Sequence, residues 1–488
     1  MTQTQFLLFI IAAIPFLNCL LMRLCKDSPT SLNLVNKFLP LLFLANLIGL
    51  CGNVKNDSSY LTIAEAMRGI SLGFAIDEIA LKFSFLLNFF WLIFIFYSQR
   101  FLQMIEEKNS YQLKFFFLLI VAFVNLIILS KNPLSILFFY NCLLPLCHFF
   151  AVKFLHKADT KFSRLFTFLL YLESVFLFLA IVATYKFTGQ IDFANGGVIS
   201  QNFDQTKHVL LLFFYLSGLF LSVLLPCYLL YRNITLDPLV IYTLFFLAYG
   251  FSSLYIFVKL LNFIFGLKGF ALIISKIGFG FFEWIFLLNI GVSSWLLLVS
   301  KGLKSSLFYL FFQQFLFALF SIILFATFNG TRIYLGLFSF LLSMTLIFLC
   351  LSNFILYLTK AENKRLDGLF YKLTVTSVLF IFGVLNLSGA APALGAVEKF
   401  FLIKIIFQKK LWVSGLILFT NFVGLIFFSW KIFRPLFLRS DKEILQVDSP
   451  DTALAKNIDF DSSLILTALT VAVAMLLGLT FFPLITNS

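Results

Sequence analysis

The stretch LNLSGAAPALGAVEKFF, residues 385–401, interrupts a long apolar run in the C-terminal half of the chain. Helix-breaking residues stand at three positions within it: Gly389, Pro392 and Gly395. The adjacent Glu398 and Lys399 follow directly. As one straight helix, the surrounding segment 373–407 would extend on the order of 50 Å, too long for a hydrocarbon core about 30 Å thick. We therefore predict two half-helices joined at Gly389–Gly395, with room for water beside a lysine that gains and loses a proton.

The composition places the chain in a lipid bilayer. Of its 488 residues, 61% are hydrophobic and only 12% are charged, whereas about a quarter of a soluble domain is charged. The 71 phenylalanines carry no polar atom and suit contact with lipid. The net charge of +14 does not indicate a nucleic-acid partner, because the lysines and arginines lie in short loops between apolar runs, as membrane topology signals do.

Fourteen apolar segments approach the length that a membrane span needs, roughly 17–25 residues. They are 5–24, 37–52, 73–97, 113–130, 133–152, 165–187, 209–231, 238–265, 270–298, 305–328, 333–359, 373–407, 411–430 and 462–484. Basic residues concentrate in the odd-numbered connections, so the positive-inside rule places those connections on the inner face and both termini on the outer face. The predicted fold class is an all-α polytopic membrane protein with about 14 transmembrane helices.

Cysteine and histidine do not indicate a metal centre. None of the seven cysteines forms a CxxC pair, and the three histidines show no metal-ligand spacing. We therefore predict no bound metal or haem, and we interpret the cysteines as small apolar core residues.

Six lysines fall within the predicted spans: Lys82, Lys186, Lys259, Lys276, Lys399 and Lys404. A charge near the bilayer centre costs about 2.5–3.5 kcal/mol, so such groups normally face a partner, the protein interior or a water-filled path. Lys186 lies near a span end, where its amine reaches the headgroups, and Lys82 and Lys276 have the same option. Lys399 follows a helix break and is the hardest to explain in this way.

Among the carboxylates, Glu173 lies near the middle of the sixth span, where it is costly unless paired or protonated. Glu283 is a less clear case, and Glu398 is either a local partner of Lys399 or faces the other side. The candidates for a proton path are Lys399, Glu173, Lys259, Glu398, Glu283 and Lys276.

A weaker helix break recurs in the seventh span, where LSGLFLSVLLPCYLL contains Gly218 and Pro226. Broken helices in corresponding positions of two halves point to inverted repeats with the transport path at the break. The two broken spans are five apart, which predicts two inverted five-helix repeats. The predicted domains are a three-span segment at 1–112, repeats at 113–265 and 266–431, and a polar loop with the last span at 432–488.

The longer stretch LNLSGAAPALGAVEKFFLIK resembles the twelfth-span signature of the antiporter-like membrane subunits of the proton-pumping NADH:ubiquinone oxidoreductase, complex I. The stretches 161–189, 300–309 and 366–389 resemble the same family. A lysine at the place of Lys399 is typical of subunits 2 and 5, whereas subunit 4 carries a glutamate there. Subunit 5 also has a long lateral helix for which the end at Ser488 leaves no room, so the resemblance favours subunit 2.

This resemblance implies a non-redox subunit of an enzyme complex that couples NADH:ubiquinone electron transfer to proton translocation. The chain would hold no cofactor, and FMN, iron–sulfur clusters and ubiquinone would lie elsewhere in the complex. The implied partners are neighbours like subunits 4L and 4, accessory subunits and lipids such as cardiolipin. With the phenylalanine-rich composition, the resemblance implies a mitochondrial inner-membrane location with both termini toward the intermembrane space, or the plasma membrane of a bacterium.

The chain departs from the family's pattern in its first half. Tyr140 stands where the family has a glutamate in span five, Leu221 replaces a span-seven lysine, and Ser252 replaces the central lysine of span eight. We hypothesise that Glu173 substitutes from the neighbouring span and pairs with a lysine such as Lys259.

Two other functions stay open at this point. One is a stand-alone cation/proton antiporter on the same fold, against which the missing span-five glutamate argues. The other is a structural subunit with a disabled proton channel, which the losses at positions 140, 221 and 252 favour.

Overall fold

A computed structural model of the protein describes most of the chain. The described residues are 3–25, 28–51, 60–67, 70–105, 110–154, 160–199, 205–224, 238–300, 302–360, 368–437, 458–459 and 461–486. They belong to two compact units. The first unit comprises Met1–Ser98, Glu107–Arg232 and Thr243–Ile273, and the second comprises Gln99–Glu106, Asn233–Tyr242 and Ile274–Ser488.

The architecture is that of an α-helical, multi-pass membrane protein. Eleven of the described helices are long and apolar enough to cross a bilayer, and three shorter apolar helices cover Thr206–Phe220, Thr374–Ser388 and Ser463–Leu477. Each of these fourteen lies on one of the fourteen predicted spans, so the predicted fold class is confirmed. Helices are the expected solution because a backbone in lipid must satisfy its N–H and C=O groups within the segment.

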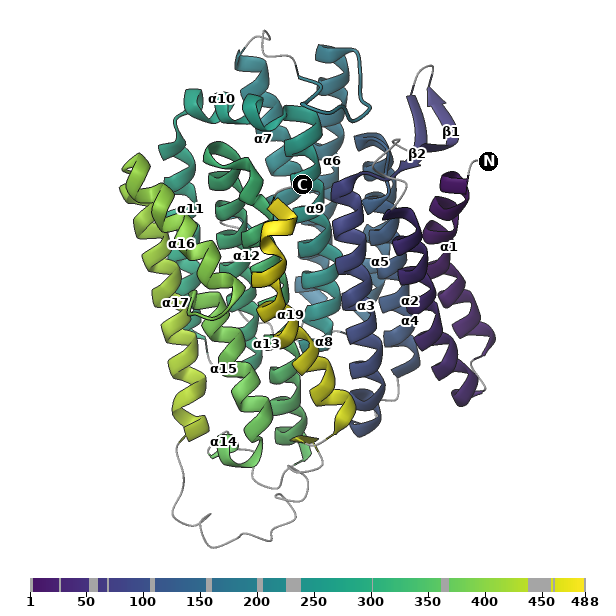
Figure 1. The fold of residues 1–488 in the computed structure, drawn as a ribbon, viewed down its shortest axis with the longest axis vertical. Helices are drawn as coiled ribbons and strands as arrows, with labels where there is room; N and C mark the ends of the chain where they lie inside the picture. The colour runs from purple at the N-terminus through teal and green to yellow at the C-terminus, as the bar shows by residue number, and fades with distance from the viewer. Residues whose placement is uncertain are drawn as a thin grey trace, which may run out of the picture. The chain divides into compact units, whose positions relative to one another are not determined.

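The first unit is built mainly from the N-terminal helices. Their bounds are α1 Gln3–Leu24, α2 Pro29–Cys51, α3 Glu78–Ile105, α4 Ser110–Ile128, α5 Pro133–Phe154, α6 Thr160–Thr188 and α7 Gln205–Phe220. α1 packs against α2 and α4, and the chain then continues through the neighbouring pairs α4–α5, α5–α6 and α6–α7 (Figure 1). This antiparallel succession leaves α5, α6 and α7 side by side, which brings their polar residues within reach of one another.

The eighth span is irregular. It runs through α8 Pro238–Ile241, the π-helical η3 Tyr242–Phe251, α9 Ser252–Leu260 and the π-helical η4 Leu261–Phe265. Its most apolar stretch is entirely buried. π-helical turns often mark functional positions, because they leave the regular i→i−4 ladder and re-aim side chains.

The second unit is arranged around two of its own helices, α12 and α13, which are buried. Its helices are α11 Phe279–Val299, α12 Leu303–Phe328, α13 Ile333–Lys360, α14 Leu369–Lys372, α15 Thr374–Ser388, α16 Leu394–Lys409, α17 Trp412–Phe437 and α19 Ser462–Thr486. α13 contacts α12, α15, α16 and α19, and α11 packs against α12 and α17 (Figure 1). α12 and α13 are apolar nearly all round, as expected of helices that other helices enclose.

Three local features differ from the prediction. An antiparallel hairpin, β1 Tyr60–Met67 with β2 Ile70–Ala75, occupies the predicted start of span three, so α3 begins only at Glu78. The predicted ninth span is divided at Gly278 (φ 86°) into a short helix, α10 Leu267–Ile277, and the membrane helix α11. Apolar composition alone separates neither a paired strand nor a short helix from the span that follows it. α7 ends at Phe220, and the predicted break at Pro226 lies outside the described residues.

The predicted division into inverted repeats, with its four domains, stays a prediction.

Candidate functional site

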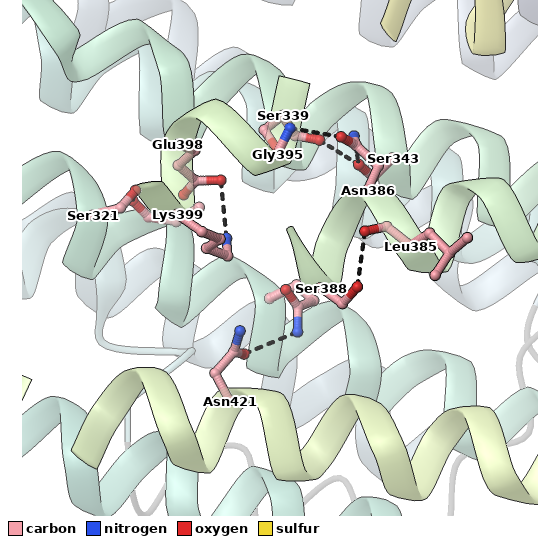
Figure 2. A network of polar contacts seen from close by, with 12 residues as sticks. Ser321, Ser339, Ser343, Leu385, Asn386, Ser388, Gly395, Glu398, Lys399 and Asn421 are labelled. Atoms are coloured by element: carbon pink, nitrogen blue, oxygen red, sulfur yellow. Dashed lines mark hydrogen bonds and ion pairs between the residues drawn. The ribbon is translucent and has the colours of Figure 1, made fainter. Parts of the chain in front are cut away.

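The predicted helix break is present between α15 and α16. α15 ends at Ser388, Gly389 adopts a left-handed conformation (φ 86°), and α16 begins at Leu394. The Asn386 side chain bridges the break, because its Oδ1 accepts the Gly395 N–H at 2.7 Å (Figure 2). Its Nδ2 donates to Ser343 on α13 at 2.5 Å, which ties the break to the buried centre of the second unit.

Two glycines allow this close crossing of the half-helices. A Cβ added at Gly395 would lie 1.9 Å from the Asn386 carbonyl oxygen, and one at Gly389 would lie 2.4 Å from Lys399 Cγ. Gly389 also needs the positive φ that other residues adopt at a cost. Pro392 lies between them in a cis peptide bond and is exposed. The predicted break residues therefore place the Lys399 side chain against the end of α15.

An Asp on a distant segment holds the start of α15. Asp459 is buried and accepts the backbone N–H groups of Val375 and Thr376, each at 2.9 Å, together with the Thr376 hydroxyl at 2.8 Å. A carboxylate at a helix N-terminus satisfies N–H groups that lack partners within the helix. This contact fixes the first half-helix from the end opposite the break.

Lys399 and Glu398 form an ion pair at the start of α16. Lys399 Nζ lies 3.0 Å from Glu398 Oε2, with side-chain exposures of 12% and 3% (Figure 2). The amine also lies 4.2 Å from the centroid of the Phe317 ring on α12. A Cβ at Gly336 would lie 2.1 Å from Ser321 Oγ and 2.9 Å from Glu398 Oε1, so both oxygens lie beside Gly336, where a larger residue would have its side chain. Of the two orientations open to Glu398, the structure has the local pair.

Glu173 is fully buried within the first unit and is surrounded by donors. Its Oε1 accepts the backbone N–H of Ser222 at 2.7 Å, and the Tyr249 hydroxyl lies 3.1 Å from the same oxygen. The Tyr140 hydroxyl donates to Oε2 at 3.5 Å. α5, α6, the turn after α7 and η3 thus each contribute one side of this site. These donors stabilise a carboxylate, and when the carboxyl is protonated its O–H can donate a hydrogen bond to either hydroxyl oxygen.

Two of the three positions at which the sequence departs from the pattern of the family it resembles lie at Glu173. Tyr140 contacts the carboxylate directly, and Leu221 immediately precedes the Ser222 N–H that binds it. Ser252, the third, is buried, and among the described residues its hydroxyl donates to backbone oxygens, one of them Tyr249 O at 3.2 Å. A carboxylate on the neighbouring helix therefore stands beside the place where the family has its span-five glutamate.

Lys259 does not pair with Glu173, so the hypothesised pair is wrong. Its Nζ lies 3.1 Å from Asp77 Oδ2 and donates to Ser130 O at 3.0 Å. Asp77 also accepts the Ala80 N–H at 2.7 Å, which caps α3. The ion pair joins the end of α9 to the start of α3 and the end of α4. The lysine side chain is 1% exposed and the aspartate side chain 25%. Asp77 lies far from Lys259 along the chain, so the sequence did not point to this pairing.

Lys259→Met is expected to lower the free energy of unfolding by about 2 kcal/mol, because Asp77 and the Ser130 carbonyl lose their donor in a largely buried position. Thermal denaturation of the purified protein measures this loss, and Lys268→Met, at an exposed lysine on α10, is the matched control. Equal melting midpoints for the two variants would contradict a structural role for the pair.

Glu283 caps a helix in the second unit. Its Oε1 accepts the backbone N–H of Ser414 at 3.0 Å and also the Ser414 hydroxyl, so it binds the first turn of α17. At the other end of the same two helices, Lys431 on α17 donates to Leu297 O at 3.3 Å and to the Ser300 hydroxyl at 2.9 Å. Each helix therefore places a charge at the terminus of the other where the helix dipole favours it. This geometry favours a capping role for Glu283 over a role in a proton path.

The remaining lysines do not gather at either site. Lys276 is exposed in the last turn of α10, outside the membrane helix α11, so its predicted place within a span is wrong. Lys186 and Lys404 are exposed, and Lys82 pairs with Glu78 at 2.8 Å one turn away on α3. In the part of the chain that the structure describes, no group of three His, Cys, Asp or Glu residues could hold a metal ion. That this chain carries no redox cofactor stays a prediction.

Sequence reasoning missed one polar cluster, which we name the amide cluster: Gln313, Gln314, Asn421 and Ser294. Gln313 Nε2 donates to Ser294 Oγ and to the Asn421 backbone oxygen, each at 3.0 Å. Gln314 Nε2 donates to Asn421 Oδ1 at 3.0 Å. All four side chains are buried between α11, α12 and α17. The adjacent glutamines in the apolar run FFQQFLF were the available signal.

Comparison with known proteins gave structural matches only. No protein-family model matches the sequence, and a search of curated protein sequences found no significant match. Among solved structures, a chain of the Mrp complex from Dietzia sp. DQ12-45-1b is similar at a TM-score of 0.76 and 17% identity, over 100% of this chain and 96% of that one.

Two further similar chains come from respiratory assemblies. One belongs to respiratory complex I from Thermus thermophilus, at a TM-score of 0.69 and 15% identity over 97% of this chain and 98% of that one. The other belongs to the membrane-bound sulfane sulfur reductase, an archaeal respiratory membrane complex. Its TM-score is 0.71 and its sequence identity 16%, over 95% of this chain and 75% of that one. At these identities the likeness shows the fold, which is that of membrane subunits in complex I and related multi-subunit complexes.

Proposed function

We propose that this chain is a proton-carrying membrane-arm subunit of complex I, similar to its subunit 2. The single observation that carries the proposal is the Lys399–Glu398 pair, held at a broken helix inside a bundle with the fold of such subunits. The likeness over nearly the whole length of a complex I chain supports an assignment within that complex. The proposed location is the mitochondrial inner membrane, with both termini toward the intermembrane space and other membrane-arm subunits as neighbours.

Lys399 is the group that exchanges the proton. Its ammonium form is stabilised by the Glu398 carboxylate at 3.0 Å and by the face of the Phe317 ring. A change of charge at Glu398 would alter the contact that holds this ammonium. Electron transfer elsewhere in the complex would supply that change. The residues of this chain hold the proton and release it, and they take no part in redox chemistry.

Glu173 is the proposed proton carrier of the first half. It stands beside Tyr140, which occupies the family's glutamate position, and it is surrounded by three donors rather than by a cation among the described residues. A buried carboxyl group without a cationic partner accepts a proton more readily than one that is paired with a cation. If instead Glu173 serves only to join α6 to η3, this half of the subunit is structural, which is the second candidate.

Membership in complex I is tested on native membranes. After gentle solubilisation, complexes are resolved on a native gel, stained for NADH oxidation and examined by mass spectrometry for peptides from the polar 440–461 segment. We expect these peptides in a large NADH-oxidising band. Their presence only in a small band without that activity would overturn the assignment and favour a stand-alone cation/proton antiporter. The relay role is tested separately by removing the charge of Lys399 in the intact complex.

A further inference from the structure

The first turn of α15 depends on a distant residue for its hydrogen bonds. The first N–H groups of a helix have no partner within the helix, and Leu373, which precedes α15, makes no side-chain hydrogen bond to them. The buried Asp459 binds them instead: Oδ2 accepts the Val375 N–H and Oδ1 the Thr376 N–H, each at 2.9 Å. Both oxygens of this carboxylate therefore hold α15.

A second aspartate, two residues further along, binds a different helix. Asp461 Oδ1 accepts the Ser463 N–H at 3.0 Å at the start of α19, and Asp461 Oδ2 lies 2.6 Å from Arg100 Nε. α19 then packs against α13, α15 and α16 (Figure 1). The chain thus passes from a cap on the first half-helix into a helix that contacts both halves of the broken span.

The other end of α15 meets α16 without spare room. Asn386 Oδ1 accepts the Gly395 N–H at 2.7 Å (Figure 2). A Cβ at Gly395 would lie 1.9 Å from the Asn386 carbonyl oxygen, and one at Gly389 would lie 2.4 Å from Lys399 Cγ. α15 has 15 residues and is about 22 Å long, and a packed helix of this length moves as a rigid element. A displacement of its first turn is therefore transmitted to the break.

We propose that Asp459 is a positioning residue for the Lys399–Glu398 pair. The inference rests on the proposed function of Lys399. By holding the start of α15, the carboxylate fixes how far this half-helix extends toward α16, and so where Lys399 Nζ lies relative to Glu398 Oε2, now 3.0 Å away. Without the carboxylate, two backbone N–H groups and one hydroxyl lose their acceptor. Buried donors without a partner are costly, so the first turn of α15 shifts to find other acceptors.

Asp459→Ala tests the inference in vesicles containing the intact complex. We expect the number of protons taken up per NADH oxidised to fall about tenfold, because a misplacement on the order of 1 Å at a reacting group slows a reaction by at least this much. A cap with only a structural role would reduce the amount of assembled complex, so both rates would fall together and their ratio would not change. A wild-type ratio in the assembled variant would overturn the proposal.

Asp461→Ala is the matched control. It removes a capping carboxylate from the same short segment, but one that binds α19 and Arg100 instead of α15. The ratio of proton uptake to NADH oxidation should stay at the wild-type value, whatever the yield of complex. An equal fall of the ratio in the Asp459 and Asp461 variants would show a general loosening of the segment, and the specific role of Asp459 would be wrong.

Asp459→Asn decides if the alanine variant does not assemble. The asparagine keeps one oxygen that accepts hydrogen bonds from the first turn of α15, but its amide nitrogen accepts none. We expect a ratio between those of the wild type and of a complex without the carboxylate. A wild-type ratio in this variant would overturn the positioning role.

Lys399→Met separates failure of this inference from failure of the proposed function. If Lys399→Met lowers the ratio of proton uptake to NADH oxidation while the Asp459 variants keep it, the positioning role is wrong and the function of Lys399 stands. If Lys399→Met also keeps the wild-type ratio, the proposed function fails, and the inference about Asp459 fails with it.

Discussion

Lys399→Met is expected to slow the proton translocation that depends on this chain by about a hundredfold, a typical loss when a positioned proton-transfer group is removed. Methionine keeps most of the length of the side chain, but it has no ammonium to lie against the Phe317 ring and carries no proton. NADH oxidation should persist, because no redox step involves the side chain. The measurement compares NADH oxidation with proton uptake in the same vesicles containing the reconstituted complex.

Lys404→Met is the matched control for this experiment. Lys404 lies on the same helix as Lys399 but is exposed, so its charge is not held by the break. The control should leave both rates close to those of the wild type. Proton uptake that is unchanged in Lys399→Met would refute the relay role, and the structural subunit would become the better interpretation. A complete loss of NADH oxidation in the control would show that the assay reports assembly instead.

Gly395→Ala is expected to destabilise the second unit by at least about 3 kcal/mol, at the upper end of the cost of overpacking a buried site. The new methyl group would lie 1.9 Å from the Asn386 carbonyl oxygen, which is a backbone atom and cannot rotate away. Relief requires the two half-helices to separate, and this breaks the hydrogen bond from the Gly395 N–H to Asn386. The loss is measured as a lower thermal midpoint and a smaller yield of assembled complex on native gels.

Gly291→Ala provides the comparison for a glycine without this constraint. A Cβ at position 291 on α11 would meet no atom within 4 Å, so the variant should melt and assemble like the wild type. If Gly395→Ala and Gly291→Ala behave alike, the close crossing of α15 and α16 does not contribute to stability. The structural explanation for the glycines at the break would then be wrong.

The sequence by itself determined the class of the protein and its most distinctive local feature. A chain that is 61% hydrophobic must satisfy its backbone within helices in lipid, so apolar runs predicted the fourteen spans. The break at Gly389–Gly395 was predictable because the segment is too long for one span and contains residues that interrupt helices. Adjacency along the chain left the Glu398–Lys399 contact as one of two orientations, and the structure decided between them. These features depend on neighbouring residues and on the solvent, which a single sequence records.

Only the tertiary structure decided which distant groups meet. The sequence shows that Lys259 and Glu173 carry a high free-energy cost in lipid. Any suitable partner relieves that cost, so the sequence does not say which partner each side chain has. In the structure, Lys259 forms an ion pair with Asp77, and Tyr140 and Tyr249 lie beside Glu173. It also brings Gln313 of α12 onto Asn421 of α17, more than 100 residues away. The physical reason is that a buried charged or polar side chain requires a partner, whereas the packing of the helices decides which partner it meets.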